Sequence, residues 1–291
     1  MITNLRNDIL SVDISSLGAE AVEIRRLDLD CSYLWGGDAK YWGSHAPLLF
    51  PMVCAAMNGE IKVDGRKYPL NNHGFVRKME FELADVTETR AEYHLHANEK
   101  TLTMYPFRFH LIVIYTLVEN RLEIEYQVLN TDSREIFFQI GTHPGFNCPL
   151  DANTAFEDYY LAFEQPENLE REYLNAANVR IVGKRASLGT NVTKLPLTHA
   201  LFADGALVFS AFKSSKVVLK SDRTDRQVAV RFENMHQMGF WQPKDAPFVC
   251  IEPWHGLADV DGYDGEFKDK DAIVRLPNGQ RFTCRLVIEG S

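Results

Sequence analysis

Apolar and polar residues alternate along many short stretches of the chain, a pattern typical of β-strands with one buried face. In residues 79–83, 122–128, 228–232 and 282–288, every second residue is apolar. Residues 111–118 are apolar at nearly every position, so we expect a central strand that is covered on both faces. Residues 164–198 show weaker periodicity, and we expect loops and short elements there.

Turn-forming residues separate the alternating stretches, as at Asp64-Gly65 and at 277–279, where the chain reads Pro-Asn-Gly. No stretch longer than about ten residues holds a helical period, and strands do not alternate with helical segments. The pattern therefore predicts an all-β protein, whose antiparallel strands form a large β-sandwich or a barrel. We find no linker or internal repeat, so residues 1–291 are interpreted as a single domain.

The composition is that of an ordinary globular protein, with 45% hydrophobic and 24% charged residues. The net charge of −9 repels nucleic acid and anionic lipid, so neither is expected as a partner. The first residues lack the pattern of a signal peptide, and the longest apolar stretch, 46–57, is too short to span a bilayer. Five widely spaced cysteines, an odd number, favour free thiols, and we expect a soluble cytoplasmic protein.

Three segments interrupt the alternation and combine a titratable side chain with glycine or proline: residues 71–77, 141–147 and 250–256. Pro144 and Pro253 restrict the preceding His143 and Glu252 to extended conformations, so both side chains are expected to leave a strand end in a fixed direction.

Small and flat residues accompany these titratable groups. Gly74 and Gly145 lack a Cβ beside each histidine, which would let a ligand approach. Phe75, Phe146 and Trp254 offer flat apolar faces to a sugar ring. Alone, a strand-end histidine beside glycine or proline is more often a turn residue, and Glu252 could equally form a buried salt bridge with an arginine. Three such segments in one β-rich chain favour a site. The sequence does not show that they converge.

The three segments, in this order, resemble the signature of the aldose 1-epimerase (galactose mutarotase-like) family over essentially the whole chain. Residues 73–77, His-Gly-Phe-Val-Arg, are similar to the HGFAR-like motif of the shorter bacterial branch of that family. Residues 240–241 and 248–254 resemble the last sugar-site strands of that branch, and residues 41–51 resemble the family's N-terminal segment. The resemblance implies a galactose mutarotase-like β-supersandwich.

The resemblance also implies an activity, the interconversion of the α and β anomers of an aldohexose without cofactor or metal. By analogy, Glu252 takes the proton from the anomeric hydroxyl, His143 protonates the ring oxygen, and His73 hydrogen-bonds the sugar. Carboxylate and imidazole suit this exchange because their pKa values can be tuned to neutral pH. We expect three further residues of these motifs to contact the sugar: Asn72, Arg77 and Trp241. The expected partner is a small sugar, and the protein is expected to be a monomer or homodimer.

The chain departs from the family pattern at residues 53–57, where many relatives carry a sugar-binding Gly-Arg. Arg77 could replace that arginine on sugar hydroxyls, or it could receive a phosphate, with Lys78 or Lys62 beside it. A surface salt bridge is the competing interpretation. The acidity of the chain favours a neutral sugar. Asp204 lies one position before the place where relatives carry an aspartate, and we assign it no role.

Two other motifs suggest metals. His94 and His96 share a face of an expected strand, with Glu99 close behind, as in a cupin-type metal site, but the third ligand would have to come from elsewhere in the chain. We therefore interpret them as two solvent-facing histidines of a strand. Residues 259–266 form an acidic loop without the order of an EF-hand, and we interpret it as a solvated turn. The alternative to an enzyme is a sugar-binding or sugar-sensing protein of the same fold.

Overall fold

The alternating stretches form antiparallel strands in the computed structural model, which describes residues 1–291. The all-β prediction is therefore confirmed. Nine strands make the largest sheet, whose spatial order is β18 (Val192–Pro196), β15 (Tyr159–Glu167), β20 (Lys216–Ser221), β21 (Val228–Glu233), β25 (Arg281–Gly290), β11 (Arg121–Asn130), β10 (Phe109–Val118), β9 (Arg90–His96) and β8 (Glu82–Val86).

A second sheet has eight strands: β17 (Arg180–Ser187), β16 (Glu170–Leu174), β19 (Leu207–Phe209), β22 (Gln237–Trp241), β23 (Phe248–His255), β13 (Ile140–Thr142) and β5 (Leu48–Leu49), with β14 (Gly145–Asn147) also paired to β23. A third sheet contains the N-terminal strands β1 (Ile2–Arg6), β2 (Leu10–Ser15), β3 (Glu20–Arg26) and β4 (Cys31–Ser32).

The remaining elements are short. Two two-stranded sheets are formed by β6 (Glu60–Val63) with β7 (Arg66–Pro69), and by β12 (Ile136–Phe138) with β24 (Val274–Leu276). The helical turns are α1 (Glu99–Leu102) and the 3₁₀ helices η1 (Met57–Gly59), η2 (Val76–Lys78), η3 (Phe156–Asp158), η4 (His199–Phe202) and η5 (Phe267–Asp269).

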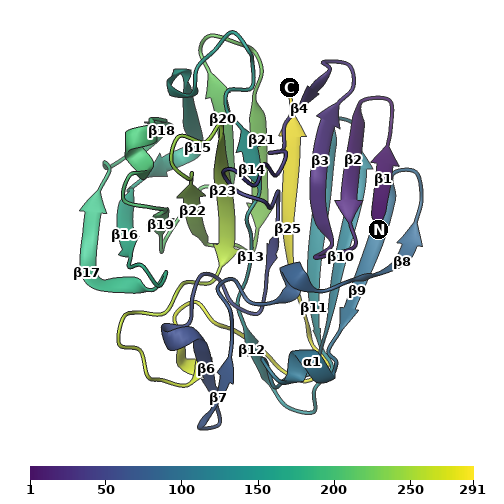
Figure 1. Ribbon diagram of the computed structural model, residues 1–291, viewed down its shortest axis with the longest axis vertical. Helices are drawn as coiled ribbons and strands as arrows, with labels where there is room; N and C mark the ends of the chain where they lie inside the picture. The colour runs from purple at the N-terminus through teal and green to yellow at the C-terminus, as the bar shows by residue number, and fades with distance from the viewer.

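The nine-stranded sheet forms one layer, and the other two large sheets lie against its inner face (Figure 1). On the N-terminal half, the Tyr115 hydroxyl of β10 donates a hydrogen bond of 2.6 Å to the Ala19 carbonyl just before β3. On the other half, the rings of Phe163 in β15 and Phe240 in β22 stack with centroids 6.1 Å apart. These contacts join the layers into one apolar core of 66 buried residues.

The expected central strand at residues 111–118 lies in β10, between β9 and β11. Its inner face is fully buried. Its outer face is mixed, since Ile112 is 7% exposed and Ile114 is half-buried. The strand is central, as predicted, but its outer face is only partly covered.

The prediction of loops in residues 164–198 is wrong, because β16, β17 and β18 lie there. β17 and β18 are the outermost strands of their sheets, and most of their side chains are exposed on both faces. An edge strand with two polar faces carries no apolar alternation, so its periodicity is weak in the sequence.

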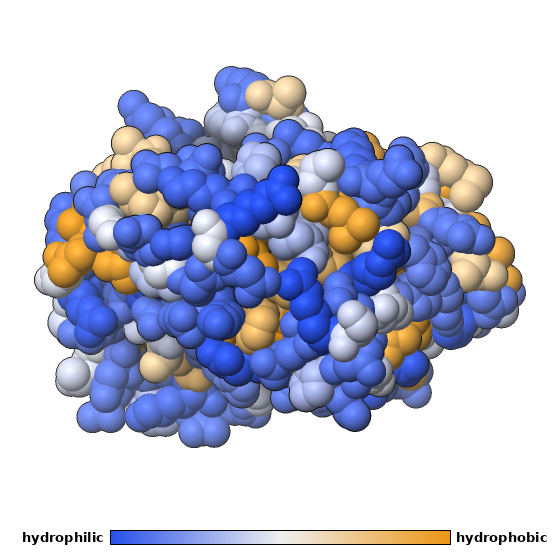
Figure 2. Space-filling model, turned by 90° about the horizontal axis from the view of Figure 1, so that it is seen from below, coloured by the Kyte–Doolittle hydropathy of each residue, from blue (hydrophilic) through white to orange (hydrophobic).

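No helix of the structure is long and apolar enough to cross a membrane. The surface seen from below the view of Figure 1 is mostly hydrophilic, with apolar residues in small separate groups (Figure 2). Large exposed hydrophobic side chains are few and scattered, as is normal for a protein surface: Met1, Ile2, Leu17, Leu29, Val86 and Val182.

Candidate active site

Glu252 lies in the middle of β23, a strand buried at seven consecutive positions. The expected position at a strand end was wrong, because β23 continues to His255, with β22 on one side and β13 and β14 on the other. The Glu252 side chain is only 2% exposed. Desolvation raises the pKa of this carboxyl well above its ordinary value.

His143 lies between β13 and β14, two short strands that both pair with β23. Its backbone N–H donates to the Pro47 carbonyl at 3.1 Å, which fixes the segment. Its Nε2 lies 3.1 Å from Oε2 of Glu252, and its side chain is 10% exposed. Burial lowers the pKa of His143 to about 3, with a smaller contribution from Arg77. Burial thus disfavours the charged form of both partners, which favours Glu252 as the carboxylic acid beside His143 as the neutral imidazole.

His73 lies in a turn with φ of 63°, a left-handed conformation that is uncommon outside glycine. Its backbone N–H donates to the Cys54 carbonyl at 2.8 Å, and its Nδ1 accepts the Cys54 N–H at 3.1 Å. The neutral ring therefore carries its proton on Nε2, which is free to donate. Desolvation lowers the pKa of His73 well below its ordinary value, with His143 and Arg77 adding to the effect. The rings of His73 and His143 are 5.4 Å apart.

Arg77 belongs to the 3₁₀ helix η2, so the chain from His73 to Arg77 is not extended. The turn nevertheless directs both side chains toward one cavity. Arg77 Nη2 donates to the Asn72 carbonyl at 3.1 Å. Desolvation lowers the pKa of the guanidinium, which nonetheless stays charged at neutral pH. Neither Lys62 nor Lys78 lines the cavity, and Arg77 is its single permanent cation.

These side chains surround a cavity of about 200 Å³. Pockets for drug-sized ligands hold roughly 300–1,000 Å³, so this one suits a single small ring. The structure brings all six sequence-predicted site residues to it, although their catalytic and binding roles stay predictions. The lining residues are Trp42, Cys54, Asn72, His73, Arg77, His143, Leu174, Asn178, Ala206, Trp241, Glu252 and Trp254.

Several buried polar atoms of the lining have no hydrogen-bond partner in the protein. They are Oδ1 of Asn72, Nε of Arg77, Nδ1 of His143 and Nε1 of Trp254. A buried donor or acceptor without a partner costs about 1–3 kcal/mol, so such groups rarely gather without a ligand or water to satisfy them. These atoms include both hydrogen-bond donors and acceptors, as the hydroxyls of a sugar would require.

The aromatic part of the lining differs from the sequence prediction. Phe75 and Phe146 are 3% and 0% exposed and lie in the core rather than in the cavity. Trp254 does line it, and so does Trp42, whose ring centroid lies 4.8 Å from that of His143. Trp42 stands in a stretch that resembles the family's N-terminal segment, which was the one available signal for it.

The glycines beside the histidines accommodate the protein rather than a ligand. A Cβ on Gly74, whose φ is 70°, would lie 2.0 Å from the Phe50 carbonyl oxygen, so only glycine fits this crossing. A Cβ on Gly145 would approach the side chains of Trp35, Trp42 and Phe248. The expectation that these positions admit a ligand was wrong.

The β16–β17 hairpin supplies Leu174 and Asn178 to one wall, and sequence reasoning did not identify either residue. Ala206 from the turn before β19 lines the same cavity, whereas Asp204 is exposed and lies outside the lining. These three residues stand in weakly patterned stretches, so no sequence signal marked them.

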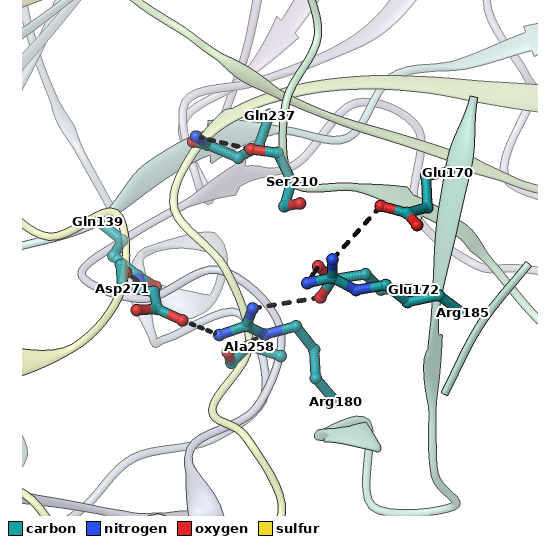
Figure 3. A network of polar contacts seen from close by, with 9 residues as sticks. All are labelled: Gln139, Glu170, Glu172, Arg180, Arg185, Ser210, Gln237, Ala258 and Asp271. Atoms are coloured by element: carbon teal, nitrogen blue, oxygen red, sulfur yellow. Dashed lines mark hydrogen bonds and ion pairs between the residues drawn. The ribbon is translucent and has the colours of Figure 1, made fainter. Parts of the chain in front are cut away.

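A network around Arg180 holds this wall in position (Figure 3). Arg180, at the start of β17, pairs with Glu172 of β16 at 3.2 Å and with Asp271 at 2.5 Å, and its Nε donates to the Ala258 carbonyl at 3.0 Å. Gln139 donates to the Asp271 carbonyl at 3.0 Å and accepts the Val53 N–H at 3.2 Å. The hairpin is thereby tied to the segments on either side of the cavity.

One group of side chains at the cavity has the spacing of metal ligands. The ligand atoms of His143, Cys250 and Glu252 lie within 4.8 Å of one another. Burial raises the pKa of the Cys250 thiol and of the Glu252 carboxyl, so the protonated forms are favoured, which is the opposite of what a metal ligand needs.

The first aspartate of the acidic loop, Asp259, is buried against Lys270 instead of being solvated as predicted.

Comparisons with known proteins agree with this geometry. The family model described as "Aldose 1-epimerase" matches residues 1–270. Protein LacX (plasmid) from Lactococcus lactis subsp. lactis is 30% identical over 285 residues, which cover 95% of each chain. A galactose mutarotase related enzyme from Lactobacillus acidophilus is 32% identical, with a TM-score of 0.94 over 100% of this chain and 97% of that one. A galactose mutarotase-like protein from Lactobacillus casei is 29% identical, with a TM-score of 0.93 over 100% of both chains.

Proposed function

Because the chain belongs to the aldose 1-epimerase family, we propose that it interconverts the α and β anomers of a free aldohexose in the cavity at Glu252 and His143. The observation that carries the proposal is the contact of 3.1 Å between a buried carboxyl and a buried imidazole at a cavity of about 200 Å³. This pair can remove a proton from one sugar oxygen and deliver one to another, which is all that ring opening requires.

The proton chemistry follows from the pair. Glu252 as carboxylate takes the proton of the anomeric hydroxyl, and His143 as imidazolium gives its proton to the ring oxygen. The C1–O5 bond breaks, O1 becomes the aldehyde oxygen, and the pair becomes neutral. Rotation about C1–C2 followed by the reverse transfers closes the other anomer.

The pair holds the same number of protons before and after each half-reaction. Burial favours the neutral form, Glu252 carboxylic acid with His143 imidazole, over the ion pair. The 3.1 Å contact lets a proton pass from Glu252 to His143 before the ring opens, so the reactive ion pair forms without solvent, and the reverse transfers at ring closure regenerate it. Sugar hydroxyls in a nearly dry cavity would lower the free energy of the charged form only where they donate to the carboxylate.

The other lining residues supply position and electrostatics. His73 presents an Nε2–H that can donate to the anomeric oxygen and stabilise charge there, since its Nδ1 is held by the Cys54 N–H. Arg77 and Asn72 present unpartnered atoms that suit sugar hydroxyls, and Arg77 occupies the role of the arginine missing at residues 53–57. Trp42 and Trp241 offer their rings to the apolar face of the sugar.

A neutral sugar suits the cavity better than a phosphosugar. Arg77 is the single lysine or arginine in the lining, and one of its nitrogens already donates to the Asn72 carbonyl. A phosphate dianion would bring two charges to one partly used cation, beside the Glu252 carboxyl. We therefore propose a free aldohexose as the substrate, with Arg77 and Asn72 binding its hydroxyls.

Anomer exchange measured by NMR or polarimetry tests the proposal. Freshly dissolved α-anomers of several aldohexoses, and their 6-phosphates, are mixed with purified protein and with the Glu252→Gln variant. We expect at least one free aldohexose to reach anomeric equilibrium faster with the wild-type chain than with buffer or with the variant. A chain that binds sugars but accelerates none of them would support the sugar-binding alternative instead.

A further inference from the structure

A cluster of three histidines lies on the outer face of the nine-stranded sheet, whereas the candidate active site is built on the eight-stranded sheet. His94 and His96 stand two residues apart in β9 and point to the same face. His110 of β10 is directly opposite His96 in the antiparallel register. The third ligand that the His-x-His motif lacked in the sequence therefore comes from the adjacent strand.

The three rings are close enough to share one ion. The centroids of His96 and His110 are 3.9 Å apart with nearly parallel planes, and those of His94 and His110 are 4.7 Å apart. One ring nitrogen from each histidine lies within 4.8 Å of the others. In a tetrahedral zinc site with Zn–N bonds of 2.0–2.1 Å, ligand nitrogens are about 3.4 Å apart, so the stacked rings of His96 and His110 would have to rotate apart until their lone pairs converge on the ion.

The cluster contains a buried nitrogen that nothing in the protein satisfies. Nε2 of His110 has no hydrogen-bond partner. A buried imidazole nitrogen that no protein group satisfies has a lone pair available to a metal ion.

The carboxylate of Glu92 contacts one histidine of the cluster. Oε1 of Glu92 lies 2.7 Å from Nε2 of His94, which leaves Nδ1 of His94 for a metal. Such a carboxylate–histidine contact fixes the tautomer and orientation of a metal-binding imidazole. His96 is exposed and His94 is half-buried, so an ion can enter from solvent.

We propose that His94, His96 and His110 bind one zinc ion on the outer face of the nine-stranded sheet, with Glu92 orienting His94. Three imidazoles without a thiolate or further carboxylate suit zinc and leave its fourth position to water or a small ligand. The site goes beyond the proposed anomer exchange and is not part of it.

Zinc titration of the purified, chelator-stripped protein against a chromophoric zinc chelator tests the site. The wild-type chain is compared with His96→Gln/His110→Gln, with Glu92→Gln, and with His199→Gln as the matched control. His199 is also a half-buried histidine with a carboxylate partner, Glu157, but it has no histidine neighbours. Thermal unfolding of each variant without metal shows that it is folded.

We expect the wild-type chain and His199→Gln to bind one equivalent of zinc that the double variant does not bind. Glu92→Gln should retain the equivalent with about 10–100-fold weaker affinity. With cobalt in place of zinc, the wild-type chain should show the visible absorption of a four-coordinate nitrogen site. The double variant should show no such absorption. Equal zinc binding by the wild-type chain and the double variant, or no saturable binding by either, would overturn the proposal. Zinc removal should leave anomer exchange unchanged, which separates this site from the active site.

Discussion

Replacing Glu252 by Gln should abolish most of the activity and at the same time stabilise the protein above mildly acidic pH. The amide has the size of the carboxyl and can still hydrogen-bond His143, but it cannot take a proton. Loss of one positioned acid or base lowers a rate by about 10²–10⁴-fold, which corresponds to about 3–5 kcal/mol in the activation free energy. We expect the anomer-exchange rate to fall within that range.

The stability effect follows from burial. Desolvation raises the pKa of Glu252 in the folded state above that in the unfolded chain, so the folded state keeps a proton that the unfolded state releases. Stability from this group is fully present below the unfolded carboxyl pKa, about 4.5, and is lost as pH rises toward the folded pKa. Each pH unit in that window costs up to about 1.4 kcal/mol through Glu252 alone, and the Gln variant avoids this contribution.

Chemical denaturation at several values between pH 5 and pH 8, with anomer exchange measured on the same samples, provides the test. Glu80→Gln, which removes an exposed carboxyl, is the control and should change neither quantity by much. The stability difference between the Glu252 variant and the wild-type chain should grow with pH. A variant that is inactive and also less stable at every pH would mean that Glu252 holds the fold as an ionised partner, and the desolvation argument would be wrong.

Further expectations concern the rest of the site. His143→Gln should slow anomer exchange by at least about 10²-fold while thermal unfolding shows a folded chain; a near-normal rate would remove His143 from the mechanism. The acid limb of the pH–rate profile should lie near pH 3, because burial lowers the pKa of His143 to about 3, and the alkaline limb should lie well above the ordinary carboxyl pKa of 4.5, because burial raises the pKa of Glu252; an acid limb near the ordinary histidine pKa of 6.5 would contradict this. Arg77→Ala should raise KM for free aldohexoses by about tenfold, the loss of one charge-assisted hydrogen bond, and a loss confined to 6-phosphates would show that Arg77 binds phosphate.

The motifs of the sequence were sufficient to select six residues that line one cavity. Pro144 and Pro253 mark His143 and Glu252, and the His-Gly-Phe-Val-Arg run marks His73 and Arg77. The side chains of Asn72 and Trp241 lie in the same segments or next to them, and all six line one cavity. These residues were recognisable because their neighbours have strong local signatures.

The rest of the lining had no such signature. Leu174 and Asn178 come from the hairpin that leads into the exposed edge strand β17, and Ala206 comes from the turn before β19, so no apolar alternation marks these residues. Phe75 and Phe146, like Trp254, stand within three residues of a titratable side chain, yet they lie in the core. Which side of a turn an aromatic ring occupies depends on the layers packed around it, and the sequence does not encode those layers locally.

Alternating stretches determined the strands and the all-β class, because a half-buried strand must repeat its apolar residues with period two. Only the tertiary structure decided which strands are neighbours. That decision places His143 on Glu252, across two short strands paired with β23, and His110 beside His96, across the β9–β10 pair. Both clusters are formed by strand pairing between separate segments of the chain, and pairing is selected by the packing of the whole core rather than by any one segment.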